Sequence, residues 1–476
     1  MKRLMLAGLL AVAVALTGTA YAEVQNIKVG GDIDLKATSH HNFDLKNETQ
    51  ANFATGTVAN LDDENFYLST VRVWVDADLT DNVSTRVRLL NQRKWDTDAA
   101  GASNINIDNA YVTLKEFLYS PLTLIAGRQD LNYGTGFIVG PGLLNDPETI
   151  FGGARSREFS AYNAYDAVRV ILDYSPVTIE ALIAKINESN TTDRDQNLYG
   201  VVVTYKLDRW NGEVAPYWFW KDDRAAALTV HDNGRTYNEN DVHTIGAWAS
   251  LSPMENVKLH GEGAYQFGEL RDNDTASPGF QERDRSAFGA NIDANYTWTQ
   301  VPWTPVTGVG WVYFSGEKSN ASDGITDQND DYGAWDSMYR GQFFTAINDF
   351  LAGTDGPGGL YATVDPNDTG GATNRHVVYF DLWTKPMQDL TAGLRYSYLW
   401  VPEAPTVIER GSASKRDSEL GHEIDGKVEY AYTDDVKLGL IGAIFLPGNY
   451  YDGRLDSNTR SDDNAWEVVG SASVKF

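Results

Sequence analysis

Extended segments in which apolar and polar residues alternate recur along the whole chain, and the connections between them alternate in length. One clear example is "YLSTVRVWVDADL" (67–79), and about eighteen such segments can be counted. Short connections such as 80–82 and 174–176 alternate with long ones such as 130–165 and 316–375. A membrane-spanning barrel has this asymmetry because its periplasmic turns are tight and its extracellular loops are long. The pattern therefore predicts an all-β fold, a transmembrane antiparallel β-barrel of about 18 strands with short periplasmic turns and long extracellular loops.

The two sides of each segment support that prediction. In the segment just quoted, Val71, Val73 and Val75 alternate with Arg72 and Asp76. Single charges between valines would be costly against lipid, but not against water in a lumen. A soluble all-β domain would alternate in the same way, so the loop lengths and the first residues of the chain have to decide between the two classes.

The first residues have the pattern of a secretory signal. Two basic residues precede an apolar stretch, which reaches a small-x-small cleavage site at Ala20-Tyr21-Ala22. We expect residues 1–22 to be a signal peptide and residues 23–476 to be a single β-barrel domain in the outer membrane of a Gram-negative cell. The alternative is a retained membrane anchor. Elsewhere no stretch has the roughly 18 consecutive apolar residues that a spanning helix needs.

Composition narrows the class of function. The formal net charge is -27 at pH 7, which argues against nucleic-acid binding because that requires a basic surface. The chain has no cysteine and carries 13 Trp, 25 Tyr and 18 Phe. Many aromatics among few long apolar runs are typical of a barrel with interfacial girdles. The last segment, 465–476, ends on Phe476, and we expect it to pair with the first, 27–37, to close the cylinder.

Four stretches resemble the alginate-export family of outer-membrane barrels. They are "AGRQDLNYGTGF" (126–137), "GEGAYQFGE" (261–269), "YFSGEKSNASDG" (313–324) and "GHEIDGKVEYAYTDDVKLGLIGAIFLPGNYY" (421–451). The resemblance implies a monomeric barrel that conducts a solute across the outer membrane, with polysaccharide export as the namesake activity. We expect no catalytic residues.

The residues expected to line the lumen carry both signs of charge. The candidates are Arg72, Arg86, Arg88, Arg128, Arg169, Glu262, Asp381, Arg395, Glu423, Asp425 and Glu429. A lumen for an anionic polyuronate should be dominated by Arg and Lys, so the mixed set supports a channel better than it supports alginate. The three arginines on 67–79 and 83–92 could form a basic ladder opposite an acidic face at 423–429, and that field would select ions. The alternative is that these charges pair with one another.

The loops 130–165 and 316–375 are candidates for a constriction of the lumen. In the second, Phe343, Ile347 and Leu351 have near-helical spacing. A loop of this length is usually functional or disordered. We expect one of the two loops to fold inward and narrow the passage; the alternative is a cap outside the barrel.

The second loop also contains a weak calcium candidate. Asp327, Asn329 and Asp331 offer oxygen ligands at alternating positions, but the Gly at the sixth place of an EF-hand loop is missing. A solvated acidic rim is the alternative, in which divalent ions would bridge to lipopolysaccharide phosphates. We expect no cofactor other than Ca²⁺ at these extracellular loops.

The sequence favours a passive outer-membrane channel for polar solutes, or for export of an anionic polysaccharide such as alginate. The expected partners are outer-membrane lipid, lipopolysaccharide and the solute, and the chain is expected to act as a monomer. Two other classes stay open. One is an outer-membrane enzyme, for which no nucleophile can be named, and the other is a structural or adhesive barrel whose loops bind a partner.

Overall fold

The structure is a computed structural model, and it describes most of the chain from the first barrel strand onward. The described residues are 25–43, 45, 64–95, 105–141, 159–188, 195–224, 228–230, 235–237, 239–272, 281–317, 331–351, 373–404, 406–409, 412–415, 417–451 and 463–476. The signal peptide predicted at 1–22 lies outside them, as do Asp327 and Asn329 of the calcium candidate.

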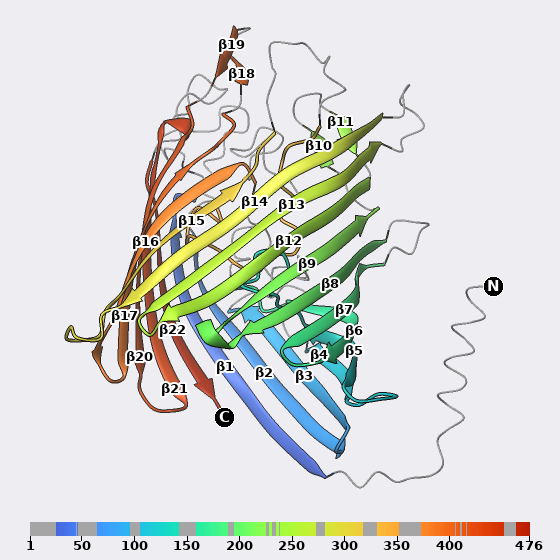
Figure 1. The fold of residues 1–476 in the computed structure, drawn as a ribbon. Coiled ribbons are helices and arrows are strands. Elements are labelled where there is room, and N and C mark those ends of the chain that lie inside the picture. Colours follow the sequence, from blue (N-terminus) through green and yellow to red (C-terminus); the bar gives the residue numbers. More distant parts are fainter. Residues whose placement is uncertain are drawn as a thin grey trace.

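In this part of the chain, eighteen strands form one antiparallel sheet that closes on itself (Figure 1). Each strand pairs with the next one along the wall, so the predicted fold is confirmed. The strands are β1 (Asn26–His41), β2 (Glu64–Thr80), β3 (Val83–Lys94), β4 (Asn106–Leu114), β5 (Leu122–Asp130), β6 (Ala164–Asp173), β7 (Val177–Asn187), β8 (Gln196–Leu207), β9 (Gly212–Asp223), β12 (Glu239–Met254), β13 (Val257–Asp272), β14 (Gln281–Thr297), β15 (Val306–Phe314), β16 (Arg375–Met387), β17 (Leu390–Trp400), β20 (Glu419–Ala431), β21 (Val436–Pro447) and β22 (Ala465–Lys475).

The remaining described elements are short and lie in the connections. They are the hairpins β10 (Leu228–Val230) with β11 (Arg235–Tyr237) and β18 (Thr406–Glu409) with β19 (Ser412–Lys415), and the 3₁₀ turns η2 (Asp208–Trp210) and η4 (Asn449–Tyr451). No described helix is long and apolar enough to cross a bilayer. Residues 331–351 contain bends, turns and isolated bridges but no helix, so the near-helical spacing in that loop does not reflect helical structure.

The barrel closes where β1 pairs with β22, as the sequence predicts. The register runs from Asp32 opposite Lys475 to His41 opposite Trp466. At the end of the seam, the Gly31 amide donates to the Phe476 carbonyl over 2.8 Å, and the Phe476 amide donates to the Gly31 carbonyl over 2.9 Å. The Phe476 ring lies over Gly31, where any Cβ would collide with it. Both edges of each of the eighteen wall strands are therefore paired, as a membrane barrel requires.

The two faces of the wall differ as the alternation predicts. Val73 and Val75 of β2 are each 40% exposed on the outside, and Ile424 and Val428 of β20 are similarly exposed. Glu423, the residue before Ile424, is fully buried on the inside. The exposed apolar set covers the outer wall because lipid, rather than a second protein layer, is its solvent.

Candidate functional site

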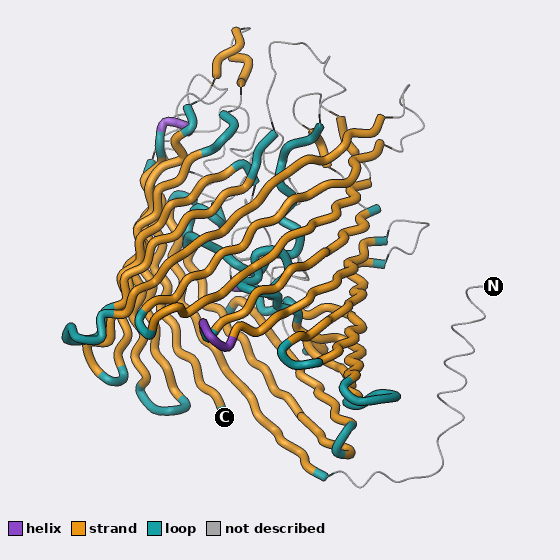
Figure 2. The backbone as a smooth tube through the Cα atoms, in the orientation of Figure 1, coloured by secondary structure: helices purple, strands orange, loops and turns teal. Residues whose placement is uncertain are grey.

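Two loops meet inside the barrel. We call residues 131–141, after β5, inner loop 1, and residues 331–351, between β15 and β16, inner loop 2. The Tyr339 amide donates to the Ile138 carbonyl over 3.0 Å, and the Gly140 amide donates to the Tyr339 carbonyl over 2.9 Å. Figure 2 shows loop segments inside the space enclosed by the strands. The sequence predicts one inward loop, whereas described parts of both lie inside.

Inner loop 2 is anchored to one side of the wall by Asp336. Its carboxylate accepts two hydrogen bonds from Lys221 Nζ on β9, at 3.1 and 3.0 Å, and one from Asn240 Nδ2 on β12, at 2.7 Å. Gln266 on β13 exchanges two bonds of 2.8 Å with the Asp336 backbone. Burial alone would raise the pKa of Asp336, but the charges of Lys221 and Arg285 outweigh it and lower the pKa to about 2. The anchor therefore stays ionised at neutral and mildly acidic pH.

The far end of inner loop 2 is held by Glu423 on β20. One carboxylate oxygen accepts the Ile347 amide at 2.6 Å and the other accepts the Asn348 amide at 2.9 Å. Inside the same turn, the Asp349 carboxylate accepts the Phe344 amide at 2.6 Å and meets Arg375 of β16 at 2.9 Å. These hydrogen bonds and the Asp349–Arg375 pair fix the turn against β16 and β20.

Apolar packing supports the same loop. Trp335 is 1% exposed, and its ring lies over Gly289 of β14, where an added Cβ would come within 2.8 Å of it. Phe137 of inner loop 1 and Phe314 of β15 pack against Trp335, with ring centroids 6.0 and 5.9 Å away. Burial of such rings stabilises the inward position of both loops.

Inner loop 1 is attached to β6 and β7. Tyr165 donates its hydroxyl to the Gly140 carbonyl over 2.8 Å. Tyr133 donates to Glu180, whose two carboxylate oxygens also accept Arg169 Nε at 2.6 Å and Nη2 at 3.0 Å. The predicted lumen residue Arg169 thus lies inside the barrel, in a bidentate pair that also holds the loop.

The arginines of β2 and β3 are paired with acids of nearby strands. Arg72 lies 3.3 Å from Asp32, and Arg86 lies 3.1 Å from Asp76. Arg88 meets Asp130 at 2.9 Å and also binds Asp108. These contacts agree with the alternative of a mutually paired network, and they place Arg72, Arg86 and Arg88 on the inner face. That the basic ladder and the acidic face together create an electric field that selects ions stays a prediction.

Arg128 is placed differently from the sequence prediction. It lies opposite Asp166 in the register and pairs with it at 3.0 Å. Asp166 is exposed and shares its face of β6 with Val168, which is 45% exposed toward lipid. The alternation of β5 puts Arg128 on the same side as Leu124, which lies opposite Val170 on that outer face. Arg128 therefore belongs to the outer wall, and its prediction as a lumen residue is wrong.

The other predicted lumen residues lie on the inner face. Arg395 makes a bidentate pair with Asp381, at 2.7 and 2.8 Å, and donates to the Phe344 carbonyl of inner loop 2 over 3.1 Å. Glu262 accepts the Tyr217 hydroxyl at 2.8 Å and is buried beside Gly134 of inner loop 1. Asp425 and Glu429 lie on the same face of β20 as Glu423. Glu429 pairs with Lys427, also on this face, at 2.8 Å.

Sequence reasoning missed Lys221 and Asp336, which hold inner loop 2. Lys221 lies near the end of β9, after the inward rings of Tyr217 and Phe219, and Asp336 lies in a long loop with many other acids. No local signal marks either residue, because their pairing depends on how the loop crosses the lumen. For the calcium candidate, Asp331 is exposed, and no group of three metal-ligating side chains occurs among the described residues.

The charge network yields one prediction. Replacing Arg86 by Glu should shift the reversal potential in a salt gradient toward cation preference, because it removes an inward guanidinium and leaves Asp76 beside a second carboxylate. Planar-bilayer recordings measure the shift. Arg128→Glu is the matched control and should leave the reversal potential unchanged, since Arg128 lies on the outer wall. Equal shifts for the two variants would contradict the placement.

Comparison with known proteins agrees with this architecture. The family model described as alginate export matches residues 41–462. Among solved structures, OccAB1 of Acinetobacter baumannii has a TM-score of 0.53 at 10% identity, covering 96% of this chain and 99% of that one. OccK2 (OpdF) of Pseudomonas aeruginosa, solved in complex with glucuronate, has a TM-score of 0.52 at 10% identity, with coverage of 95% and 99%.

A BenF-like porin from Pseudomonas fluorescens Pf-5 has a TM-score of 0.51 at 10% identity, with coverage of 95% and 100%. No curated protein matches the sequence. The structural likenesses concern the fold, whereas the family match spans most of the chain. The chain belongs to the alginate export family and forms a porin-like channel barrel of the outer membrane.

Proposed function

We propose that this channel conducts small hydrophilic anions of the sugar-acid class by passive diffusion. The observation that carries the proposal is a group of lysines at the periplasmic mouth. They lie at the short-turn ends of their strands, on positions that alternate with outward residues, and all are exposed: Lys28, Lys206, Lys258, Lys385, Lys437 and Lys475. We call them the mouth lysines. Among the described residues, none of the six makes an ion pair.

The acids that lie opposite three of the mouth lysines in the strand register are engaged elsewhere. Lys28 lies opposite Asp76, which binds Arg86, and Lys475 lies opposite Asp32, which binds Arg72. Glu213, opposite Lys206, accepts the Trp248 indole at 3.2 Å. The ammonium groups are thus free to attract anions, and a cationic ring at a pore entrance raises the local anion concentration.

The two inner loops support a small solute rather than a long polymer. They form the constriction in this proposal, since inner loops 1 and 2 are fastened to each other and to β6, β9, β13 and β20. A polysaccharide would have to displace these contacts, whereas a single sugar acid would pass beside them. The same fold accommodates glucuronate in the OccK2 structure.

The test uses three adjacent lysines. Lys28→Gln, Lys437→Gln and Lys475→Gln together should shift the reversal potential in a potassium chloride gradient toward cations and weaken current block by glucuronate added on the periplasmic side. Lys115→Gln, in the turn after β4, is the control for a general change of surface charge. Unchanged selectivity in the triple variant would contradict an anion-collecting mouth. Block by alginate chains but not by glucuronate would favour polymer export instead.

We propose further that the chain acts as a monomer and as a channel rather than as an enzyme or an adhesin. Over the described strands, the outer wall carries mostly apolar side chains, so lipid can cover it. Conductance of the purified barrel in a planar bilayer separates a channel from an adhesive barrel, and hydrolysis assays with ester and peptide substrates test the enzyme class. A barrel that inserts without conducting would contradict the proposal.

A further inference from the structure

Several aromatic rings inside the barrel lie over a glycine, at a place where any Cβ would collide with the ring. Among the described residues, the pairs are Trp74 over Gly30, Tyr217 over Gly246, Phe219 over Gly200, Trp335 over Gly289, Tyr379 over Gly310 and Trp383 over Gly393. The rings of Tyr217, Phe219, Trp335 and Tyr379 are buried, so they serve packing. Trp74 and Trp383 are only half-buried, so each presents an aromatic surface to the lumen.

Trp74 lies on the inner face of β2, between Arg72 and Asp76 on the same side of the strand. In the strand register it lies opposite Gly30 of β1, and a Cβ at Gly30 would come within 2.8 Å of the indole. Because Gly30 has no side chain, the indole can lie against the backbone of β1. The wall therefore supports the ring while part of it stays open to the lumen.

A cation lies beside the same ring. Arg86 Cζ is 5.7 Å from the centroid of the Trp74 ring. Arg86 Nε lies 3.1 Å from Asp76, and no hydrogen bond within the described part of the chain uses the two terminal nitrogens of Arg86. A guanidinium binds the two oxygens of a carboxylate side by side. An anion that rests on the indole could therefore reach free donors of Arg86.

Trp383 repeats this arrangement on β16. It lies opposite Gly393 of β17, where a Cβ would come within 2.2 Å of the ring. Lys385, one of the mouth lysines, follows two residues later on the same face of the strand. Both half-buried rings thus lie toward the short-turn ends of their strands, each with a cation nearby.

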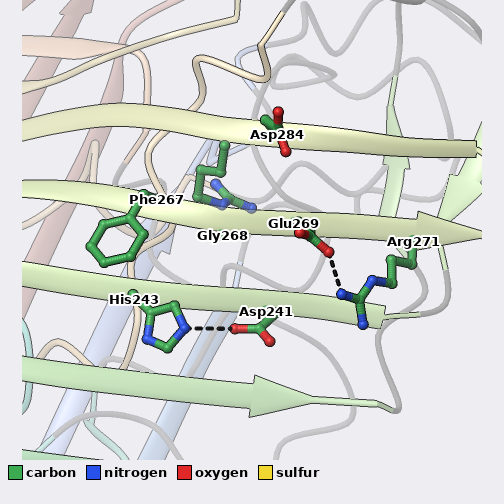
Figure 3. A pocket seen from close by; sticks show the side chains of 8 residues that line it. Asp241, His243, Phe267, Gly268, Glu269, Arg271 and Asp284 are labelled. Atoms are coloured by element: carbon green, nitrogen blue, oxygen red, sulfur yellow. Dashed lines mark hydrogen bonds and ion pairs between the residues drawn. The ribbon is translucent and has the colours of Figure 1, made fainter.

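Rings on the outer wall pack against one another instead. His243 and Phe267 stack with their centroids 5.0 Å apart, beside a pocket of about 350 Å³ (Figure 3). Arg271 in that pocket is already bound to Glu269. These rings face the membrane, whereas Trp74 and Trp383 face the route of a solute.

A pyranose acid has the two features that an indole and an adjacent cation can bind. The C–H groups of its ring form an apolar face that can stack on an aromatic ring, and its carboxylate can bind a guanidinium or an ammonium group. An open-chain acid of the same charge has no flat face to stack. The arrangement should therefore distinguish a cyclic sugar acid from an open-chain one.

We propose that Trp74 and Arg86 form a binding subsite for pyranose acids such as glucuronate, and that Trp383 and Lys385 form a second one. This inference rests on the proposed conduction of sugar acids. At each subsite the sugar ring stacks on the indole and the carboxylate binds the cation. The two subsites hold the solute on the periplasmic side of the inner loops.

The experiment compares block of the current by two acids of equal charge in planar bilayers: glucuronate, which is cyclic, and gluconate, which is an open chain. In the wild type, the half-blocking concentration should be about tenfold lower for glucuronate. Trp74→Ala and Trp383→Ala should each reduce this preference about threefold, and the double variant should abolish it, with block by gluconate unchanged. Trp74→Phe keeps a ring and should retain most of the preference.

The matched control is Trp218→Ala. Trp218 lies opposite Ile245, which is 45% exposed on the outer wall, so its removal should change neither half-blocking concentration. Heat-modifiability on gels confirms that every variant is folded. An equal loss of preference in Trp218→Ala and Trp74→Ala would show a general effect of tryptophan removal and would overturn the subsites.

The remaining outcomes separate this inference from the proposed function. Wild-type channels that prefer anions but are blocked equally by the two acids would overturn the subsites and leave anion conduction intact. Persistence of the glucuronate preference in the double variant would have the same meaning. Cation-preferring wild-type channels that neither acid blocks would overturn both proposals.

Discussion

Removal of residues 335–353 should raise the single-channel conductance severalfold. This deletion takes out the part of inner loop 2 that carries Trp335, the Asp336 anchor and the turn bound by Glu423. Wall residues that now bind the loop would instead face water in a wider lumen, and conductance rises with the open cross-section. Single-channel recording in planar bilayers measures it. An unchanged conductance would mean that the loop does not limit the current.

A point variant separates the anchor from the loop's bulk. Asp336→Ala removes the buried carboxylate that accepts hydrogen bonds from Lys221 and Asn240, a change that costs about 3–5 kcal/mol, so the loop should detach and the conductance should rise intermittently. Asp331→Ala is the matched control, because Asp331 is an exposed acid of the same loop. If the control opens the channel as often as Asp336→Ala, general loss of loop charge is the cause.

Glu423→Gln should free the other end of inner loop 2. The neutral amide offers one acceptor oxygen where the carboxylate accepts both the Ile347 and the Asn348 amides. Leaving one of these two buried amides without an acceptor costs about 2 kcal/mol. That corresponds to roughly a 30-fold larger population of the released turn, which recordings should show as frequent transitions to a higher conductance.

The control for this substitution lies on the same face of the same strand. Glu429 is paired with Lys427 in a partly exposed site, so Glu429→Gln should change the stability by less than about 1 kcal/mol and leave the gating pattern as it is. Similar transitions in both variants would mean that charge at β20, and not the seat of the loop, controls the current.

The wall of the barrel could be predicted from the sequence because each strand needs only a local pattern. Val71, Val73 and Val75 face lipid while Arg72 faces water, and this alternation is legible without knowing any partner strand. The closure of β22 on β1 followed from the need to pair the last edge. Arg128 shows the limit of this reasoning, since its charge suggested the lumen while its position in the alternation put it outside.

The interior of the barrel was predictable only in outline. Loop length indicated that 130–165 and 316–375 matter, but not that both would enter and bind each other. The contacts of Asp336 with Lys221 and of Glu423 with the Ile347 amide join residues far apart in the chain, and no periodicity encodes them. The mouth lysines could be read from the sequence, but not that they are unpaired. That requires the strand register, which shows that the acids opposite three of them are bound to arginines or to Trp248.

The seam between β1 and β22 has a consequence for how the protein matures. All other wall pairs join strands that are neighbours in sequence, so they can zip up hairpin by hairpin with modest loss of chain entropy. One edge of β1 stays unpaired until β22 has formed and the sheet has curved enough to bring the two strands together. Such a long-range step is slow. Until then, the incomplete barrel is most prone to aggregate through its unpaired strand edges.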